Sequence, residues 1–106
     1  MEGHARITWF DWWTGAAAQS FQAEHGLQLD HANWGENFPF NRVVEVPAGE
    51  KPPVNLGYLE DGQTMREVLG DGSFGGPYQI DDALMWDLFE QVVAETAGLV
   101  QALRRT

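Results

Sequence analysis

Cysteine is absent from this 106-residue sequence, which excludes a disulfide framework and any chemistry that depends on a thiolate. Basic residues are scarce, since six Lys and Arg stand against 16 Asp and Glu, and the formal net charge is −10. Such a chain repels phosphate backbones and anionic lipids, so nucleic acids and membranes are not expected as partners. No apolar run approaches the roughly 18–20 residues that span a bilayer. The first residues also lack the apolar core of a signal peptide, so we expect a cytoplasmic protein.

Aromatic side chains, by contrast, are abundant. The sequence holds five Trp, six Phe and two Tyr, and 43% of its residues are hydrophobic. This composition is typical of a globular protein rather than of a disordered one. The length suits one domain, spanning residues 1–106, and not two. On so small a body, we expect some of the aromatic rings to face a partner or a ligand.

Two segments carry the signals of helices. Residues 14–25 are rich in strong helix formers, with Thr14 as the expected N-cap and Gly26 suited to the left-handed position that follows a helix. Apolar residues recur at three- and four-residue steps over 82–105, which predicts a long amphipathic helix. Asp81 is its expected N-cap. We expect this last helix to anchor the domain through its apolar stripe.

Two shorter segments are rich in strand-forming residues. Residues 6–10 are β-branched and aromatic, which predicts a strand that needs a neighbour to pair with. Residues 43–46 favour a second short strand, and residues 64–69 favour one or two helical turns. Glycines make 70–77 an irregular loop. The order of these elements indicates an α/β fold, and further strands are expected from elsewhere because two do not make a sheet.

The densest group of chemically useful side chains lies between the two predicted helices. Asp30 and His31 are adjacent, and Glu36 follows in the same loop. Histidine moves protons near neutral pH, and a neighbouring carboxylate can orient its ring or share a metal. The alternative is a solvated loop, which is the common fate of an isolated Asp-His pair. His25, at the end of the helix over 14–25, is expected to interact with the helix dipole and not to be catalytic.

Dinucleotide binding and a complete metal site are both disfavoured by the sequence. Residues 70–75 match Gly-x-Gly-x-x-Gly, but no strand precedes them and Asp71 would face the pyrophosphate of a dinucleotide. These glycines are expected instead to let backbone segments approach closely, in packing or beside a substrate pocket. A complete metal site is not expected either, since the chain has no thiolates, no His-Glu-x-x-His motif and no spacing that joins its three histidines.

Four tryptophans flank the acidic loop in the sequence. Trp12, Trp13 and Trp34 lie at the ends of predicted elements, where an indole can wall a pocket for a flat or cyclic substrate. Core packing is the alternative for each of these three. We expect packing for Trp9, and also for Trp86 on the long helix.

In their order along the chain, these segments resemble the C-terminal portion of the creatininase family. Residues 11–13, Asp-Trp-Trp, resemble the end of the family's strand that closes in a Trp-containing segment. Residues 30–32, Asp-His-Ala, with Glu36 resemble its acid-His-Ala/Gly…Glu-Thr-Ser motif, and residues 31–39 resemble the His-Ala-x-x-x-Glu-Asn-Phe-Pro stretch of one subgroup. Residues 70–77, followed by a long helix, resemble its Gly-Asp loop and last helix. The resemblance covers nearly the whole chain and depends on the order and spacing of these motifs.

The resemblance implies a metal-dependent amidohydrolase that cleaves C–N bonds of a cyclic amide or a related small molecule. It implies a partial three-layer α/β sandwich around a mostly parallel sheet, in an oligomer. The family binds two divalent ions through an early Glu-x-His pair, an Asp soon after, and a later His-Gly-Gly-Asn or His-x-Glu-Asn motif. The chain has no counterpart of the region that carries these motifs. A divalent metal, Zn or Mn, is therefore expected with most of its ligands outside this chain. The chain looks too short to be a complete enzyme without a partner chain or a missing half.

Taken position by position, the resemblance makes His31 the general acid that protonates the leaving nitrogen. Asp30 would orient or share that proton, with a side chain one methylene shorter than the Glu that relatives often have. Glu36 matches the Glu of Glu-Thr-Ser, although Asn-Phe follows it here in place of Thr-Ser. Trp12 or Trp13 would close over the substrate.

Two other functions stay open from the sequence. One alternative is a non-enzymatic remnant or an assembly subunit of a hetero-oligomer, which docks through a strand edge and an aromatic face. The other is a small-molecule binding module built on the tryptophan cluster.

Overall fold

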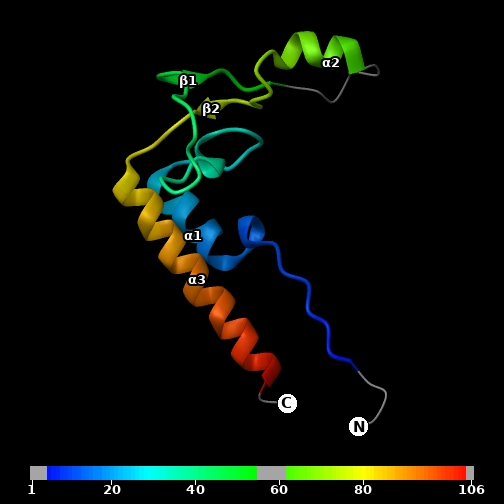
Figure 1. The fold of residues 1–106 in the computed structure, drawn as a ribbon, viewed down its shortest axis with the longest axis vertical. Helices are drawn as coiled ribbons and strands as arrows, with labels where there is room; N and C mark the ends of the chain where they lie inside the picture. The colour runs from blue at the N-terminus through cyan, green and yellow to red at the C-terminus, as the bar shows by residue number, and fades with distance from the viewer. Residues whose placement is uncertain (1–4, 55–61, 105–106) are drawn as a thin grey trace. The chain divides into compact units, whose positions relative to one another are not determined.

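A computed structural model describes residues 5–54 and 62–104 of the chain (Figure 1). Its elements are the 3-10 helices η1 (Trp12–Thr14) and η2 (Trp34–Glu36), the α-helices α1 (Ala16–His25), α2 (Gly62–Leu69) and α3 (Asp82–Arg104), and the strands β1 (Glu50–Lys51) and β2 (Gly76–Pro77). The described residues fall into two compact units. The first unit lies within Met1–Leu27 and Asp87–Thr106, and the second is Gln28–Trp86. The prediction of one domain over 1–106 stays a prediction.

Helix α1 of the first unit confirms the helix predicted over 14–25, with a later start. Thr14 belongs to η1, and its hydroxyl donates to the backbone oxygen of Asp11 instead of capping α1. The N-cap is Gly15, which has no side chain to offer. At the other end, Gly26 adopts the expected left-handed conformation, with φ of 62°. Ala18 and Phe21 supply the buried face of this helix.

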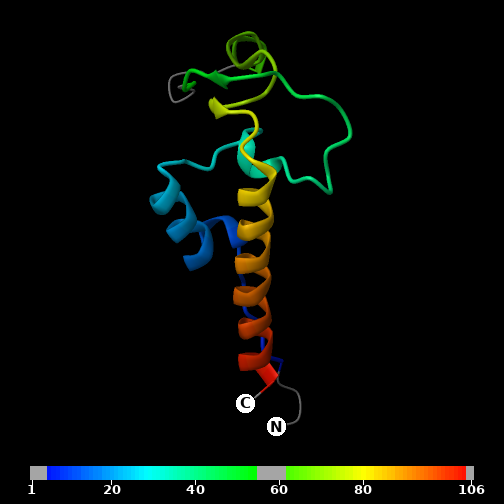
Figure 2. The same ribbon diagram turned by 90° about the vertical axis from the view of Figure 1, so that its left-hand side faces the viewer.

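A carboxylate from α3 supplies the cap that Gly15 lacks. Glu95 Oε2 accepts a hydrogen bond of 3.1 Å from the backbone nitrogen of Ala17, in the first turn of α1. The side chain also explains why the N-cap is glycine, because a Cβ on Gly15 would lie 2.6 Å from Glu95 Oε1. Helix α1 accordingly lies alongside the part of α3 that belongs to the same unit, as both views show (Figure 1, Figure 2).

Helix α3 confirms the long helix predicted at the end of the sequence. Asp81 caps it as expected, since its Oδ1 accepts a hydrogen bond of 3.0 Å from the backbone nitrogen of Ala83. The apolar stripe is only partly buried. Met85 and Leu88 have no exposed surface, whereas other members of the stripe remain 36–51% exposed: Phe89, Val93, Val100 and Leu103. The helix thus leaves a second apolar row at its surface.

The predicted strand over residues 6–10 is wrong. The segment has no regular secondary structure, and Ile7 and Trp9 are 88% and 85% exposed, so Trp9 does not pack in a core. No backbone hydrogen bond joins residues 6–10 to the other described residues, and a strand without a neighbour has no ladder to stabilise it. The strand predicted over 43–46 is wrong for the same reason, with Val43 90% exposed.

In the second unit, two very short strands pair where the sequence indicated none. Strands β1 and β2 are antiparallel, with Glu50 opposite Pro77 and Lys51 opposite Gly76. Helix α2 confirms the turns predicted over 64–69 and begins two residues earlier. A sheet of this size is too small to test the partial three-layer α/β sandwich, so that fold class stays a prediction. None of the helices within 5–54 and 62–104 has the length and apolar character needed to cross a bilayer.

Candidate functional site

Asn33 is the centre of the loop that carries the predicted site. Its side chain is buried in the second unit, and its Oδ1 accepts a 3.0 Å hydrogen bond from the backbone nitrogen of Gly35, which caps η2. Its Nδ2 donates to the backbone oxygens of Gln28 at 3.0 Å and Gly75 at 3.3 Å. One amide therefore fixes the shape of the loop and ties it to the glycine-rich segment 70–77.

Trp34 holds the same loop from inside. The indole has no exposed surface, and its Nε1 donates a 3.0 Å hydrogen bond to the backbone oxygen of Gln28. A side chain without exposed surface cannot wall a pocket in this conformation. In this conformation the indole packs inside the second unit, the alternative that the sequence left open, and the predicted contact of Trp34 with a substrate stays a prediction.

His31 lies at the surface of this loop, against Phe74. The two ring centroids are 4.6 Å apart, and the backbone nitrogen of Phe74 donates a 3.0 Å hydrogen bond to the backbone oxygen of His31. Asp30 Oδ1 accepts the backbone N–H of His31 at 2.9 Å. The carboxylate of Asp30 therefore fixes the backbone of His31, and the imidazole remains exposed on the loop.

The backbone between His31 and Glu36 is strained. Ala32 has a φ of 53°, the one positive value among the non-glycine residues that the structure describes. Conformations of this kind cost roughly 1–3 kcal/mol and persist where the surroundings impose them. Here the carboxylate of Glu36 accepts the backbone N–H of Ala32. Glu36 thus holds the strained turn that presents the imidazole.

The glycine-rich segment approaches its neighbours closely, as the sequence predicted. Gly75 has a φ of 119°, and a Cβ at this position would lie 2.7 Å from Pro53 Cα and 2.8 Å from the backbone oxygen of Pro52. The adjacent Phe74 oxygen accepts a 2.9 Å hydrogen bond from the backbone nitrogen of Val54. Only glycine provides both the dihedral angle and the space that this contact requires.

A cluster of three polar side chains closes the same segment. Lys51 Nζ donates to Asp71 Oδ1 and to the backbone oxygen of Ser73, both at 2.8 Å, and to the backbone oxygen of Leu69. The hydroxyl of Tyr78 donates to Asp71 Oδ2 at 2.5 Å. These contacts join β1 to the segment on either side of β2 and hold the glycines in place.

The cluster shifts the titration of two of its members in opposite directions. The hydrogen bond from Lys51, and after it that from Tyr78, holds the pKa of Asp71 well below its ordinary 3.8. The hydrogen bond to Asp71 raises the pKa of Tyr78 above its ordinary 10.0. The Asp71 contribution to stability is present above pH 3.8 and is lost as pH falls through the lowered pKa. The Tyr78 contribution is present below pH 10.0 and is lost as pH rises through the raised pKa.

We expect Tyr78 to titrate above pH 10.0 in the folded protein and to return toward that pH in Asp71→Asn, because a neutral amide no longer favours the protonated phenol. The absorbance of the phenolate measures the midpoint of the Tyr78 titration in a Tyr58→Phe background, in which Tyr78 is the only tyrosine. Tyr58 itself lies outside the described residues. The same midpoint with and without the Asp71 carboxylate would contradict the expectation.

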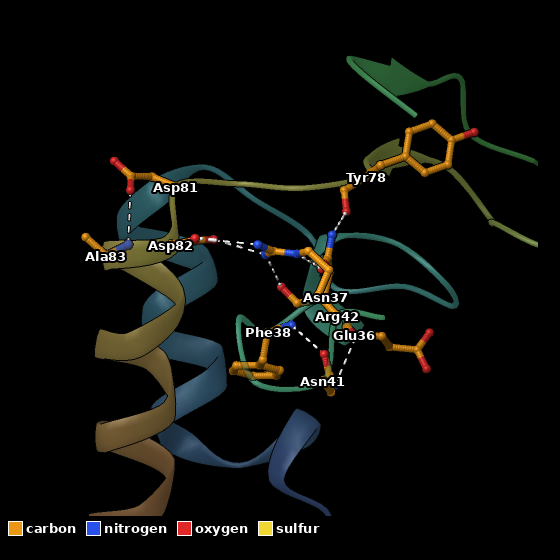
Figure 3. Close-up of polar contacts among 9 residues, drawn as sticks. All are labelled: Glu36, Asn37, Phe38, Asn41, Arg42, Tyr78, Asp81, Asp82 and Ala83. Carbon is orange, nitrogen blue, oxygen red and sulfur yellow. Dashed lines mark hydrogen bonds and ion pairs between the residues drawn. The ribbon is translucent and has the colours of Figure 1, made fainter. Parts of the chain in front are cut away.

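A second polar network secures the residues that follow Glu36 (Figure 3). Arg42 donates to Asn37 Oδ1 at 2.7 Å and forms an ion pair of 3.0 Å with Asp82, at the start of α3. Asn37 Nδ2 in turn donates to the backbone oxygen of Tyr78 at 3.0 Å. Asn41 closes the turn, because its side chain accepts the backbone N–H of Phe38 and donates to the backbone oxygen of Glu36.

The structure thus brings four of the six predicted site residues into one loop of the second unit: Asp30, His31, Trp34 and Glu36. Trp12 and Trp13 belong to the first unit, where their rings meet edge to face with centroids 6.1 Å apart and Trp13 is 51% exposed. Their predicted contact with a substrate stays a prediction, as do the catalytic roles of Asp30, His31 and Glu36.

Sequence reasoning missed the polar residues that hold the loop. Asn33, Asn37 and Asn41 recur at intervals of four, and each bonds backbone groups of the loop or its surroundings. This spacing in a loop was a usable signal, because asparagine side chains favour backbone partners in turns. Lys51 and Tyr78 gave no comparable signal, since their partners are distant or depend on the fold.

The described residues do not form a metal centre by themselves. Within 5–54 and 62–104, no group of three or more His, Asp or Glu side chains is arranged to hold a metal ion.

No family model, curated protein or solved structure matches this chain.

Proposed function

We propose that this chain is the C-terminal portion of a creatininase-like, metal-dependent hydrolase that cleaves the C–N bond of a cyclic amide or a related small molecule. The observation that carries the proposal is the strained turn at Ala32, which Glu36 holds immediately after the exposed His31. Strained backbone of this kind clusters at functional sites. The contact between His31 and Phe74 adds support, because it joins the two separate segments that carry the resemblance.

In this proposal, His31 provides the proton that the leaving nitrogen needs when the C–N bond breaks. An exposed imidazole can approach a substrate, and histidine is the side chain that most often serves as a general acid or base. Asp30 and Glu36 act mainly on the backbone on either side of the imidazole, which limits the directions in which it can point. The contact of Trp12 or Trp13 with a substrate, which the resemblance alone implies, stays a prediction.

The divalent metal is proposed to have most of its ligands outside this chain, in a partner chain or in a missing half of the same protein. The described residues do not form a metal site on their own. What the chain itself contributes is the positioned imidazole and the loop that presents it.

The proposed function is tested by reconstitution with a chain that carries the Glu-x-His and His-Gly-Gly-Asn motifs. We expect the chain alone to retain near-zero metal after incubation with Mn²⁺ or Zn²⁺, by elemental analysis, and to hydrolyse no cyclic amide. In the reconstituted enzyme, His31→Gln is expected to lower kcat by about 10²–10⁴-fold, the usual contribution of a general acid. His25→Gln is the matched control and is expected to leave kcat unchanged, because His25 lies at the end of α1.

Two results would overturn parts of the proposal. Stoichiometric metal that is lost in His31→Ala would mean that this chain builds its own metal site. Equal kcat values for His31→Gln and His25→Gln in an active reconstituted enzyme would exclude His31 as the acid.

An assembly subunit without activity is the second candidate function. The exposed segment with Ile7 and Trp9 favours it, since large apolar side chains at a surface mark contacts with other proteins. The assembly function replaces the enzymatic one if the segment with Ile7 and Trp9 binds a complementing chain but none of the reconstituted complexes hydrolyses a cyclic amide.

A further inference from the structure

Helix α3 carries an exposed row of side chains with the spacing of a coiled coil. The row consists of Phe89, Val93, Thr96, Val100 and Leu103, separated by alternating steps of four and three residues. We call these five residues the outer row. Its two valines are about half exposed, at 48% and 51%. Steps of this kind keep side chains on one stripe of a helix, which is the pattern that a second helix packs against.

The outer row is distinct from the row that α3 uses within its own unit. Leu88 is fully buried and Glu95 reaches the first turn of α1, so these residues mark a separate, inward stripe. Thr96 is the one polar member of the outer row, and its hydroxyl donates a 2.8 Å hydrogen bond to the backbone oxygen of Val92. That bond would let Thr96 enter an apolar interface without an unpaired donor.

Two opposite charges flank the same edge of the outer row. Glu90 directly follows Phe89, and Arg104 directly follows Leu103, so both occupy equivalent positions beside the row. Both side chains are exposed, and neither forms an ion pair with another described residue. The acidic group lies toward the start of the helix and the basic group at its end.

We propose that the outer row is a homodimer interface, in which α3 pairs antiparallel with α3 of a second copy of the chain. In this arrangement, Phe89 of one copy packs opposite Val100 of the second copy, and Val93 packs opposite its Thr96. Glu90 of each copy approaches Arg104 of the other, because side chains on antiparallel helices lean toward each other along this edge. Two symmetric ion pairs result.

The same surface does not suit a parallel pair. Parallel helices would bring Arg104 of both copies to one end and align the two helix dipoles unfavourably, with no ion pair at Glu90. The antiparallel arrangement satisfies both charges and opposes the dipoles. A single row of five residues is small beside the roughly 800 Å² per partner of a standard interface, so we expect a dissociation constant on the order of micromolar. This proposal is independent of the proposed hydrolase function.

Sedimentation equilibrium of the full chain over a range of concentrations tests the proposal. We expect Glu90→Arg and Arg104→Glu each to raise the dissociation constant of the dimer by about tenfold or more, since each creates two like-charge contacts. An equimolar mixture of the two variants is expected to restore association, because the mixed dimer has opposite charges at both contacts. Asp87→Arg is the matched control, with the same change of charge at an exposed position on another side of α3.

Each possible result decides the matter. A wild-type chain that stays monomeric well above micromolar concentration overturns the proposal. If both variants weaken the dimer but their mixture does not restore it, the antiparallel arrangement is wrong. If Asp87→Arg weakens the dimer as much as Glu90→Arg, the effect is not specific to the edge that carries Glu90, and the interface lies elsewhere. Circular dichroism of each variant confirms that α3 remains folded in these comparisons.

Discussion

Gly75→Ala is expected to lower the free energy of unfolding by about 3 kcal/mol or more, which is a large part of the 5–15 kcal/mol that stabilises a typical domain. Two costs add at this position. The φ of 119° disfavours any side chain by roughly 1–3 kcal/mol. The new Cβ would also meet the backbone of Pro52 and Pro53 at 2.7–2.8 Å, and forced overpacking costs a further 1–3 kcal/mol or so. Denaturant or thermal unfolding measures the sum.

Alanine substitutions at two other glycines separate the cost of the positive φ from the cost of the close contact. Gly72 also has a positive φ, of 90°, but a Cβ there would meet nothing within 4 Å, so Gly72→Ala reports the backbone cost alone. Gly98 lies within α3 with equally open surroundings, and Gly98→Ala is expected to stabilise the helix by about 0.5–1 kcal/mol. If Gly75→Ala costs no more than Gly72→Ala, the Pro52–Pro53 backbone yields easily and the close approach is not essential to the loop.

Asn33→Asp is expected to destabilise the protein by about 3 kcal/mol at neutral pH, although the two side chains have nearly the same shape. The substitution removes the two N–H donors that serve Gln28 and Gly75, and it places a carboxylate beside their backbone oxygens. The bond accepted from Gly35 is retained. Because Asn33 is only 3% exposed, water cannot compensate the new charge.

The pH dependence of this loss identifies its cause. Burial and two carbonyl oxygens raise the pKa of the introduced carboxyl, and its protonated form can donate to one of them. The difference in stability from wild type should therefore grow as pH rises through the raised pKa and shrink at acid pH. Asn41→Asp is the matched control, since Asn41 is exposed and loses a single donated bond, to Glu36. A cost for Asn33→Asp that is equal to the control, or independent of pH, would show that the loop does not depend on this amide.

The helices were predictable because their signals are local. The caps Asp81 and Gly26 and the three- and four-residue spacing of α3 all lie within a few residues of the structure they specify. The predicted strands over 6–10 and 43–46 failed because a strand depends on a partner, and no described segment provides one. Strand propensity alone does not supply that partner.

The sequence shows which loop carries the predicted site residues, but it does not show the hydrogen bonds that hold this loop. The sequence predicted catalytic roles for the side chains of Asp30, His31 and Glu36. In the structure, the two carboxylates accept hydrogen bonds from backbone N–H groups. The strain at Ala32 has no signal in an alanine, because it results from the surrounding loop. Asn33 acts through Gly75, 42 residues away in the sequence, and such a contact follows only from the fold.

The contacts of Lys51 also determine how the chain responds to acylating reagents. Lys51 is the only lysine in the sequence, so it is the only side-chain amine that such a reagent can modify. Its ammonium group can donate three hydrogen bonds, and the acceptors from Leu69, Asp71 and Ser73 take all three. Acylation of this amine therefore requires these contacts to break first, and the rate of labelling at this one site measures how often Lys51 is released from the glycine-rich segment.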